Sequence, residues 1–169
     1  PVSVDVKGEG TGRLIGYKAR SHAGLIDIDK VRHYEVLDYW EPVYAPRRGG
    51  LVLDPADFYI LASRESVKVP PTYAAEMIAY DTLVGEFRVH YAGCEDRCAE
   101  VRFRRGAGAQ RQRRGEGARA VLEVRSYEVP FVIEDGQVVG RLAYERLTAQ
   151  PTRLYGAGMN SSYQRQGIT

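Results

Sequence analysis

Residues 121–147 read VLEVRSYEVPFVIEDGQVVGRLAYERL. Apolar runs lie on both sides of Asp135-Gly136, a dipeptide that is typical of tight turns. Runs of this length and composition predict β-strands. One carboxylate, Glu123, lies inside the first apolar run, and burying an unpaired carboxylate is costly. Glu123 therefore faces either solvent or a functional site, and the interpretation of the whole chain depends on which.

The rest of the chain predicts an all-β protein. Val2, Val4 and Val6 alternate with polar residues, the period-2 pattern of a half-buried strand. Residues 72–80 are the best helix candidate, residues 34–40 are compatible with a strand, and residues 41–50 read as a turn region. Further strands are expected at residues 14–17, 25–29, 51–53, 58–62, 66–69 and 87–91. Many short strands without crossover helices indicate a barrel, sandwich or jelly roll.

Length and composition set the outer bounds. The chain has 169 residues, 44% of them hydrophobic, which fits one domain with its own core. No transmembrane run or signal peptide is apparent, and the formal net charge of +2 gives no reason to expect DNA binding. The two cysteines, Cys94 and Cys98, are too few for a structural zinc site and fit a reduced, cytoplasmic protein. Because the chain starts without Met, we expect it to be a piece of a longer protein.

Two segments stand apart from the strand pattern. Residues 94–119 contain eight arginines with interspersed glycines, which predicts an irregular loop that is solvated or, alternatively, binds phosphate. Residues 154–169 form a polar tail with two tyrosines, Tyr155 and Tyr163. Such a tail is either disordered or able to close over a ligand.

Several enzyme motifs are absent from the sequence. It contains no Walker phosphate loop, no G-x-S-x-G and no zinc-deaminase H-x-E with P-C-x-x-C. A carboxylate in apolar surroundings can activate water as a general base. Glu123 has such surroundings, and the alternative is an ion pair with Arg125 or Arg141 on a solvent-facing surface.

Several motifs resemble those of the dCTP deaminases and trimeric dUTPases. Residues 51–77 (LVLDPADFYILASRESVKVPPTYAAEM) include an E-x-V-x-V-P turn, residues 120–147 are similar to the strand–hairpin–strand that carries the deaminase base, and residues 154–167 are similar to the nucleotide-closing tail. VGEFRVHYAG and YERL also match. The similarity is greatest to the C-terminal half of the long, two-domain bacterial dCTP deaminases.

The resemblance implies a dUTPase-like distorted jelly roll of the β-clip type with one or two short helices, spanning residues 1–169. It implies deamination of dCTP to dUTP and ammonia without zinc, with Glu123 as general base and Mg²⁺ held by the triphosphate. dCTP, dUTP and dTTP are the implied nucleotides. The implied assembly is a homotrimer, or a pseudo-trimer with a second homologous domain. The implied substrate-binding residues are Ala92, Gln137, Tyr155, Tyr163 and Gln166.

The sequence also departs from the family pattern. The family's Ser-Ser-x-x-x-Arg phosphate motif should precede VGEF, but residues 77–81 read MIAYD. Residues 94–119 replace an acidic loop, which raises the hypothesis of a local reading-frame error that resequencing would test. Ser162 stands where a lysine is usual. A catalytically silent nucleotide-binding domain is therefore an alternative, and a dUTPase with Asp96 as its aspartate is a weaker one.

Overall fold

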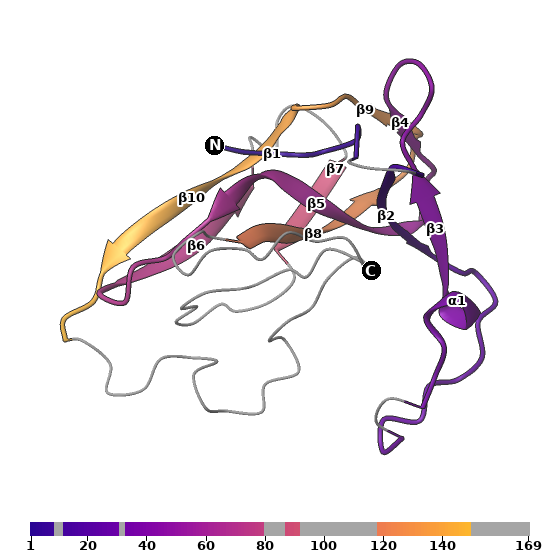
Figure 1. The fold of residues 1–169 in the computed structure, drawn as a ribbon, viewed down its shortest axis with the longest axis horizontal. Coiled ribbons are helices and arrows are strands. Elements are labelled where there is room, and N and C mark those ends of the chain that lie inside the picture. Colours follow the sequence, from indigo (N-terminus) through magenta and orange to yellow (C-terminus); the bar gives the residue numbers. More distant parts are fainter. Residues whose placement is uncertain (9–11, 31–32, 80–86, 92–117, 150–169) are drawn as a thin grey trace.

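In the computed structural model, residues 1–8, 12–30, 33–79, 87–91 and 118–149 are described. Within them the chain is almost entirely antiparallel β-structure, arranged in three sheets (Figure 1). The elements are β1 (Val2–Ser3), β2 (Leu14–Ala19), α1 (Val36–Tyr39), β3 (Trp40–Tyr44), β4 (Leu51–Leu53), β5 (Phe58–Val67), β6 (Tyr73–Ala79), β7 (Phe87–Tyr91), β8 (Ala118–Ser126), β9 (Phe131–Ile133) and β10 (Val138–Arg146). No helix in these ranges is long and apolar enough to span a membrane.

The largest sheet has the strand order β3-β2-β5-β8-β7. A second sheet is formed by β1-β10-β6 and a small third sheet by β4-β9. Leu61 of β5 and Leu122 of β8 are fully buried and lie opposite each other in the register. The core is shared by all three sheets, since Ile133 of β9 and Val139 of β10 belong to the same buried cluster.

The N-terminal segment closes this core. Val2, Val4 and Val6 are 1%, 0% and 2% exposed, as their alternation predicts. The hydrogen-bonded strand is shorter than the alternation of residues 2–6 predicts. Only Val2–Ser3 form a strand, and Val4 makes an isolated bridge to Ser63. Burial of the three valines, rather than a long ladder, therefore attaches this segment to the sheets.

The predicted helix at residues 72–80 is wrong. Residues 73–79 form β6, which pairs with β10 from Tyr73↔Arg146 to Ala79↔Gly140. Alanine, glutamate and methionine favour helices by only a few tenths of a kcal/mol each. Seven ladder pairs and the packing of Met77 against the core outweigh that preference.

The predicted strand at residues 25–29 is also wrong. These residues belong to an excursion between β2 and β3 that contains no strand. Residues 34–40 contain the short helix α1 instead of a strand, and β3 continues to Tyr44, so the turn region predicted to begin at residue 41 starts later. The strands expected at residues 14–17, 51–53 and 87–91 are confirmed, and the segments at 58–62 and 66–67 join into β5.

The Asp135-Gly136 turn is confirmed, but it does not join a paired hairpin. Gly136 has φ +77°, which favours glycine, and the Gln137 N–H donates to the Glu134 carbonyl at 3.1 Å. The strands on either side belong to different sheets, since β9 pairs with β4 whereas β10 pairs with β1 and β6. The turn therefore carries the chain from one sheet to another.

Candidate functional site

Glu123 lies on β8, an inner strand between β5 and β7 of the largest sheet, on the face that points away from the core. The other face of β8 is buried: Ala120, Leu122, Val124 and Ser126 are each at most 2% exposed. Because strand side chains alternate, Glu123 shares the outer face with Val121 and Arg125. Val121 is 7% exposed and Glu123 is partly buried. The carboxylate is thus held by a rigid strand in a partly covered position.

The neighbours of Glu123 on this outer face are mostly apolar. Its cross-strand partner on β5 is Ile60, which in turn pairs with Tyr17 of β2. Cross-strand partners project from the same face, and both Ile60 and Tyr17 are partly buried. On the other side the backbone of Glu123 pairs with that of His90 in β7. The carboxylate therefore lies beside a row of apolar and aromatic groups near the middle of the largest sheet.

Two residues further along β8, a cation lies over an aromatic ring. The Arg125 guanidinium carbon lies 4.7 Å from the centroid of the Phe58 ring, its cross-strand partner. The Phe58 and Trp40 rings approach within 5.9 Å between centroids. Ala19, the partner of Trp40 on β2, has a small side chain that leaves the space above β2 free for this contact.

Glu123 has no partner among the described residues. Within those parts of the chain its carboxylate accepts no hydrogen bond and forms no ion pair. The alternative of an ion pair with Arg125 or Arg141 is therefore wrong. Arg125 lies over Phe58, and Arg141 lies in β10 opposite Ile78, in a different sheet. A partly buried carboxylate with no partner among the described residues is free to interact with a bound ligand.

Gln137 lies at the turn before β10 and is not brought to Glu123. Its backbone carbonyl accepts the Val4 N–H at 3.0 Å, and its side-chain Oε1 accepts the Glu134 N–H at 3.0 Å. No hydrogen bond or ion pair joins it to Glu123 in the described ranges. Ala92, Tyr155, Tyr163 and Gln166, the Arg-rich segment 94–119 up to residue 117, and the tail 154–169 lie outside the described residues.

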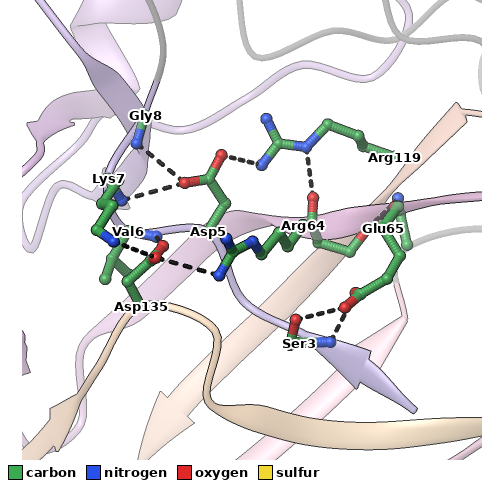
Figure 2. Close-up of polar contacts among 11 residues, drawn as sticks. Ser3, Asp5, Val6, Lys7, Gly8, Arg64, Glu65, Arg119 and Asp135 are labelled. Carbon is green, nitrogen blue, oxygen red and sulfur yellow. Dashed lines mark hydrogen bonds and ion pairs between the residues drawn. The ribbon is translucent and has the colours of Figure 1, made fainter.

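A polar cluster, which we term the clasp, fixes the N-terminal segment next to this turn (Figure 2). Asp135 accepts the Val6 N–H at 3.2 Å and pairs with Lys7 at 3.2 Å and Arg64 at 3.4 Å. Asp5 accepts a hydrogen bond from Arg119 at 2.5 Å. These contacts connect the first strand, β5, β8 and the turn before β10.

The contacts of the clasp lower the pKa of two carboxylates, Asp135 and Glu65. Burial raises the pKa of Asp135, but the hydrogen bonds from Lys7 and Val6 and the charges of Lys7 and Arg64 outweigh burial, so the pKa is lowered. For Glu65, burial is likewise outweighed by the hydrogen bonds from the Ser3 hydroxyl and N–H, at 2.5 and 2.8 Å. The clasp is therefore a satisfied structural cluster, in contrast to Glu123.

The described residues contain no group of three histidine, cysteine, aspartate or glutamate side chains that could hold a metal ion. The feature of this face that sequence reasoning missed is the contact of Arg125 with Phe58, whose ring in turn contacts Trp40. Alternation along residues 121–125 could have placed Arg125 beside Glu123. The partner strand and its register, Phe58↔Arg125, could not be read from the sequence.

Comparison with solved structures identifies the class of fold. The chain is similar to the crystal structure of 2'-deoxycytidine 5'-triphosphate deaminase from Agrobacterium tumefaciens, with a TM-score of 0.74 and 52% sequence identity. The match covers 89% of this chain and 42% of that one, so the chain spans less than half the length of this relative. The all-β architecture is therefore the dUTPase-like distorted jelly roll, as the sequence resemblance implied.

The family follows from a second comparison. The model of the family "2'-deoxycytidine 5'-triphosphate deaminase (DCD), C-terminal domain" matches residues 1–169. The chain belongs to this family of deaminase C-terminal domains. A comparison with curated proteins finds no match.

Proposed function

We propose that the chain is a deaminase domain that acts on dCTP, with Glu123 as the general base. The observation that carries the proposal is a partly buried carboxylate on an inner strand, with no partner among the described residues, in a chain of the dCTP deaminase family. An ion-paired carboxylate would be held in a structural role, whereas Glu123 is available to a ligand. The relative's name supplies the substrate.

The proposed reaction consumes one water and releases one ammonia. Glu123 removes a proton from water, the water oxygen attacks C4 of the cytosine, and the proton is returned to the leaving amine. The products are dUTP and ammonia. No side-chain group in the described ranges fits a metal ion, so we assign Mg²⁺ to the triphosphate and derive no step through a protein-bound metal or zinc.

We place the site between subunits of a trimer or between two homologous domains. In support, the outer face around Glu123 carries Ile60, Phe58 and Trp40, which their own chain covers only in part. Tyr155, Tyr163 and Gln166 of the tail, together with Ala92 and Gln137, would complete nucleotide binding in this assembly. The nucleotides proposed are dCTP, dUTP and dTTP.

A second candidate is a domain that binds nucleotide without turnover. The observation that favours it concerns residues 77–78, which stand where the family's phosphate motif is expected. Both residues have structural contacts instead. Met77 packs against the core, and Ile78 is committed to pairing with Arg141. These positions hold a strand in place and provide neither serine hydroxyls nor a guanidinium for phosphate.

The isolated chain, incubated with dCTP and Mg²⁺, distinguishes these candidates. Loss of cytosine absorbance and release of ammonia, both abolished in Glu123→Gln and retained in Glu145→Gln, would establish the deaminase. Glu145 is an exposed carboxylate of β10 and serves as the matched control. Binding of dCTP in calorimetry without ammonia release would establish the silent domain. Pyrophosphate release from dUTP would instead establish a dUTPase.

A further inference from the structure

Arg125 lies on the same outer face of β8 as Glu123, one period of the strand alternation further along. Its guanidinium carbon is 4.7 Å from the centroid of the Phe58 ring, and the Phe58 and Trp40 ring centroids are 5.9 Å apart. Arg125 is exposed, whereas Phe58 and Trp40 are partly buried. An exposed cation is therefore held over a ring that is itself packed against a second ring.

The contact with Phe58 leaves the hydrogen-bonding groups of Arg125 available. The ring attracts the positive charge and offers no ordinary acceptor, so a guanidinium over its face keeps most of its N–H donors free. Among the described residues, the Arg125 side chain donates no hydrogen bond and forms no ion pair. A planar cation with free donors matches the paired oxygens of a phosphate group.

The second arginine of β8, Arg119, is not available in this way. Alternation places Arg119 on the same face of the strand as Arg125. However, Arg119 donates hydrogen bonds to the Asp5 carboxylate and to the Ser63 carbonyl. The register places Arg88 of β7 opposite Arg125, so positive charge is concentrated near the end of β8 that Arg125 occupies.

The carboxylates of the neighbouring turn do not engage Arg125. An isolated bridge brings the turn at residues 54–57 next to the end of β8. Of its two carboxylates, Asp57 pairs with Lys18 at 3.2 Å, and Asp54 forms no ion pair within the described parts of the chain. The positive charge of Arg125 is thus left for a group that does not belong to this turn.

The proposed substrate has its reacting carbon at one end and its charge at the other. C4 belongs to the uncharged cytosine ring, whereas the triphosphate is a polyanion. Glu123 suits the uncharged end, because a carboxylate repels phosphate, and Arg125 suits the charged end. Two residues along a strand correspond to about 7 Å between Cα atoms. The two side chains are therefore spaced along one face, where a single nucleotide can contact both.

We propose that Arg125 binds the triphosphate of the nucleotide and that Phe58 positions the guanidinium for this contact. The inference rests on the proposed function, because the relative's name supplies the triphosphate. The N–H groups of Arg125 donate charge-assisted hydrogen bonds to phosphate oxygens. Phe58 acts through Arg125 and is a positioning residue, since the ring lowers the conformational freedom that the long side chain loses on binding.

Calorimetric binding of three ligands to the purified chain tests the role of Arg125. The ligands are dCTP, deoxycytidine and inorganic triphosphate, each with Mg²⁺. Arg125→Gln should weaken binding of dCTP and of inorganic triphosphate by roughly 10- to 100-fold, as expected for a lost hydrogen bond to a charged group. Deoxycytidine has no phosphate, so its affinity should change by less than about twofold.

Variants of Phe58 test the positioning role. Phe58→Leu should weaken dCTP binding by about two- to fivefold, which corresponds to an exposed cation–π contact. Phe58→Tyr keeps an aromatic ring and should bind dCTP as the wild type does. Arg141→Gln removes an exposed arginine of β10 that forms no ion pair within the described ranges, and this control should bind all three ligands normally. Circular dichroism verifies that every variant folds.

Several results would overturn the inference. A folded Arg125→Gln that binds dCTP as tightly as the wild type, or a wild-type chain that binds neither dCTP nor inorganic triphosphate, excludes the phosphate contact. An equal loss for dCTP and deoxycytidine shows that the variant disturbs the site without a specific role for phosphate. Unchanged dCTP binding in Phe58→Leu removes the positioning role.

The same measurements separate this inference from the proposed catalysis. Binding of dCTP that Arg125→Gln weakens, without release of ammonia by the wild type, supports the phosphate contact and contradicts the deaminase. Release of ammonia by the wild type, together with unchanged dCTP binding in Arg125→Gln, supports the deaminase and contradicts the phosphate contact.

Discussion

At the scale of single residues, alternation along β8 separates the core from the outer face of the sheet. Leu122 and Val124 are fully buried in the core, whereas Glu123 between them faces away from it. Arg125, two positions along, is engaged with Phe58 and leaves Glu123 without a counter-ion. A partly desolvated charge with no partner costs stability. Residues retained at such a cost are typical of functional sites.

The first prediction concerns the stability of Glu123→Gln. Because the carboxylate has no described partner, its neutralisation should leave the free energy of unfolding unchanged or raise it by up to about 1 kcal/mol. Asp5→Asn should lower it by about 1–3 kcal/mol, because Arg119 then loses its carboxylate partner. Urea denaturation at neutral pH measures both. Clear destabilisation by Glu123→Gln would indicate a structural role for the carboxylate.

The second prediction concerns the clasp and acid. Asp135 and Glu65 have lowered pKa values in the folded chain, so their contribution is complete above the unfolded values of about 3.9 and 4.3. It is lost as the pH falls through the folded values. The free energy of unfolding should therefore decrease below about pH 4.

The double variant Asp135→Asn/Glu65→Gln isolates the clasp. It should be less stable than the wild type at pH 7 and should lose less stability between pH 5 and pH 3. Urea titrations at a series of pH values measure the difference, and Glu128→Gln, an exposed carboxylate after β8, is the control. Parallel pH profiles for the double variant and the wild type would show that the clasp does not titrate as described.

At the scale of elements, the presence of a pairing strand determined whether a segment became a β-strand, and the local sequence does not reveal that partner. Strong alternation or uniform apolarity was sufficient at β2, β4, β5 and β7, where the predicted strands are confirmed. The segment that became β6 has a helical composition, and only β10 beside it makes it a strand. Residues 25–29 alternate as a strand does, but no described strand pairs with them. Periodicity reports which side chains could be buried together and does not reveal whether a partner exists.

The third prediction contrasts the core with the excursion between β2 and β3. Leu61→Ala should lower the free energy of unfolding by about 2–5 kcal/mol, because Leu61 of β5 is fully buried opposite Leu122 of β8. Leu25→Ser, at a position 97% exposed, should change it by less than about 0.5 kcal/mol when measured at concentrations where the chain is monomeric. Denaturant unfolding of both variants provides the comparison. A large cost for Leu25→Ser in the monomer would mean that this excursion is buried against its own chain.

At the scale of the whole molecule, the sequence predicted the fold class, but it could not place the candidate site residues relative to one another. Glu123 could be singled out because it interrupts an apolar strand. Its lack of an ion pair could be established only from the registers of β5, β8 and β10 in the structure. Gln137, aligned by resemblance, lies at a turn between two sheets and forms no hydrogen bond with Glu123 in the described ranges. The placement of both residues in one site therefore rests on the resemblance, since the strand registers do not join them.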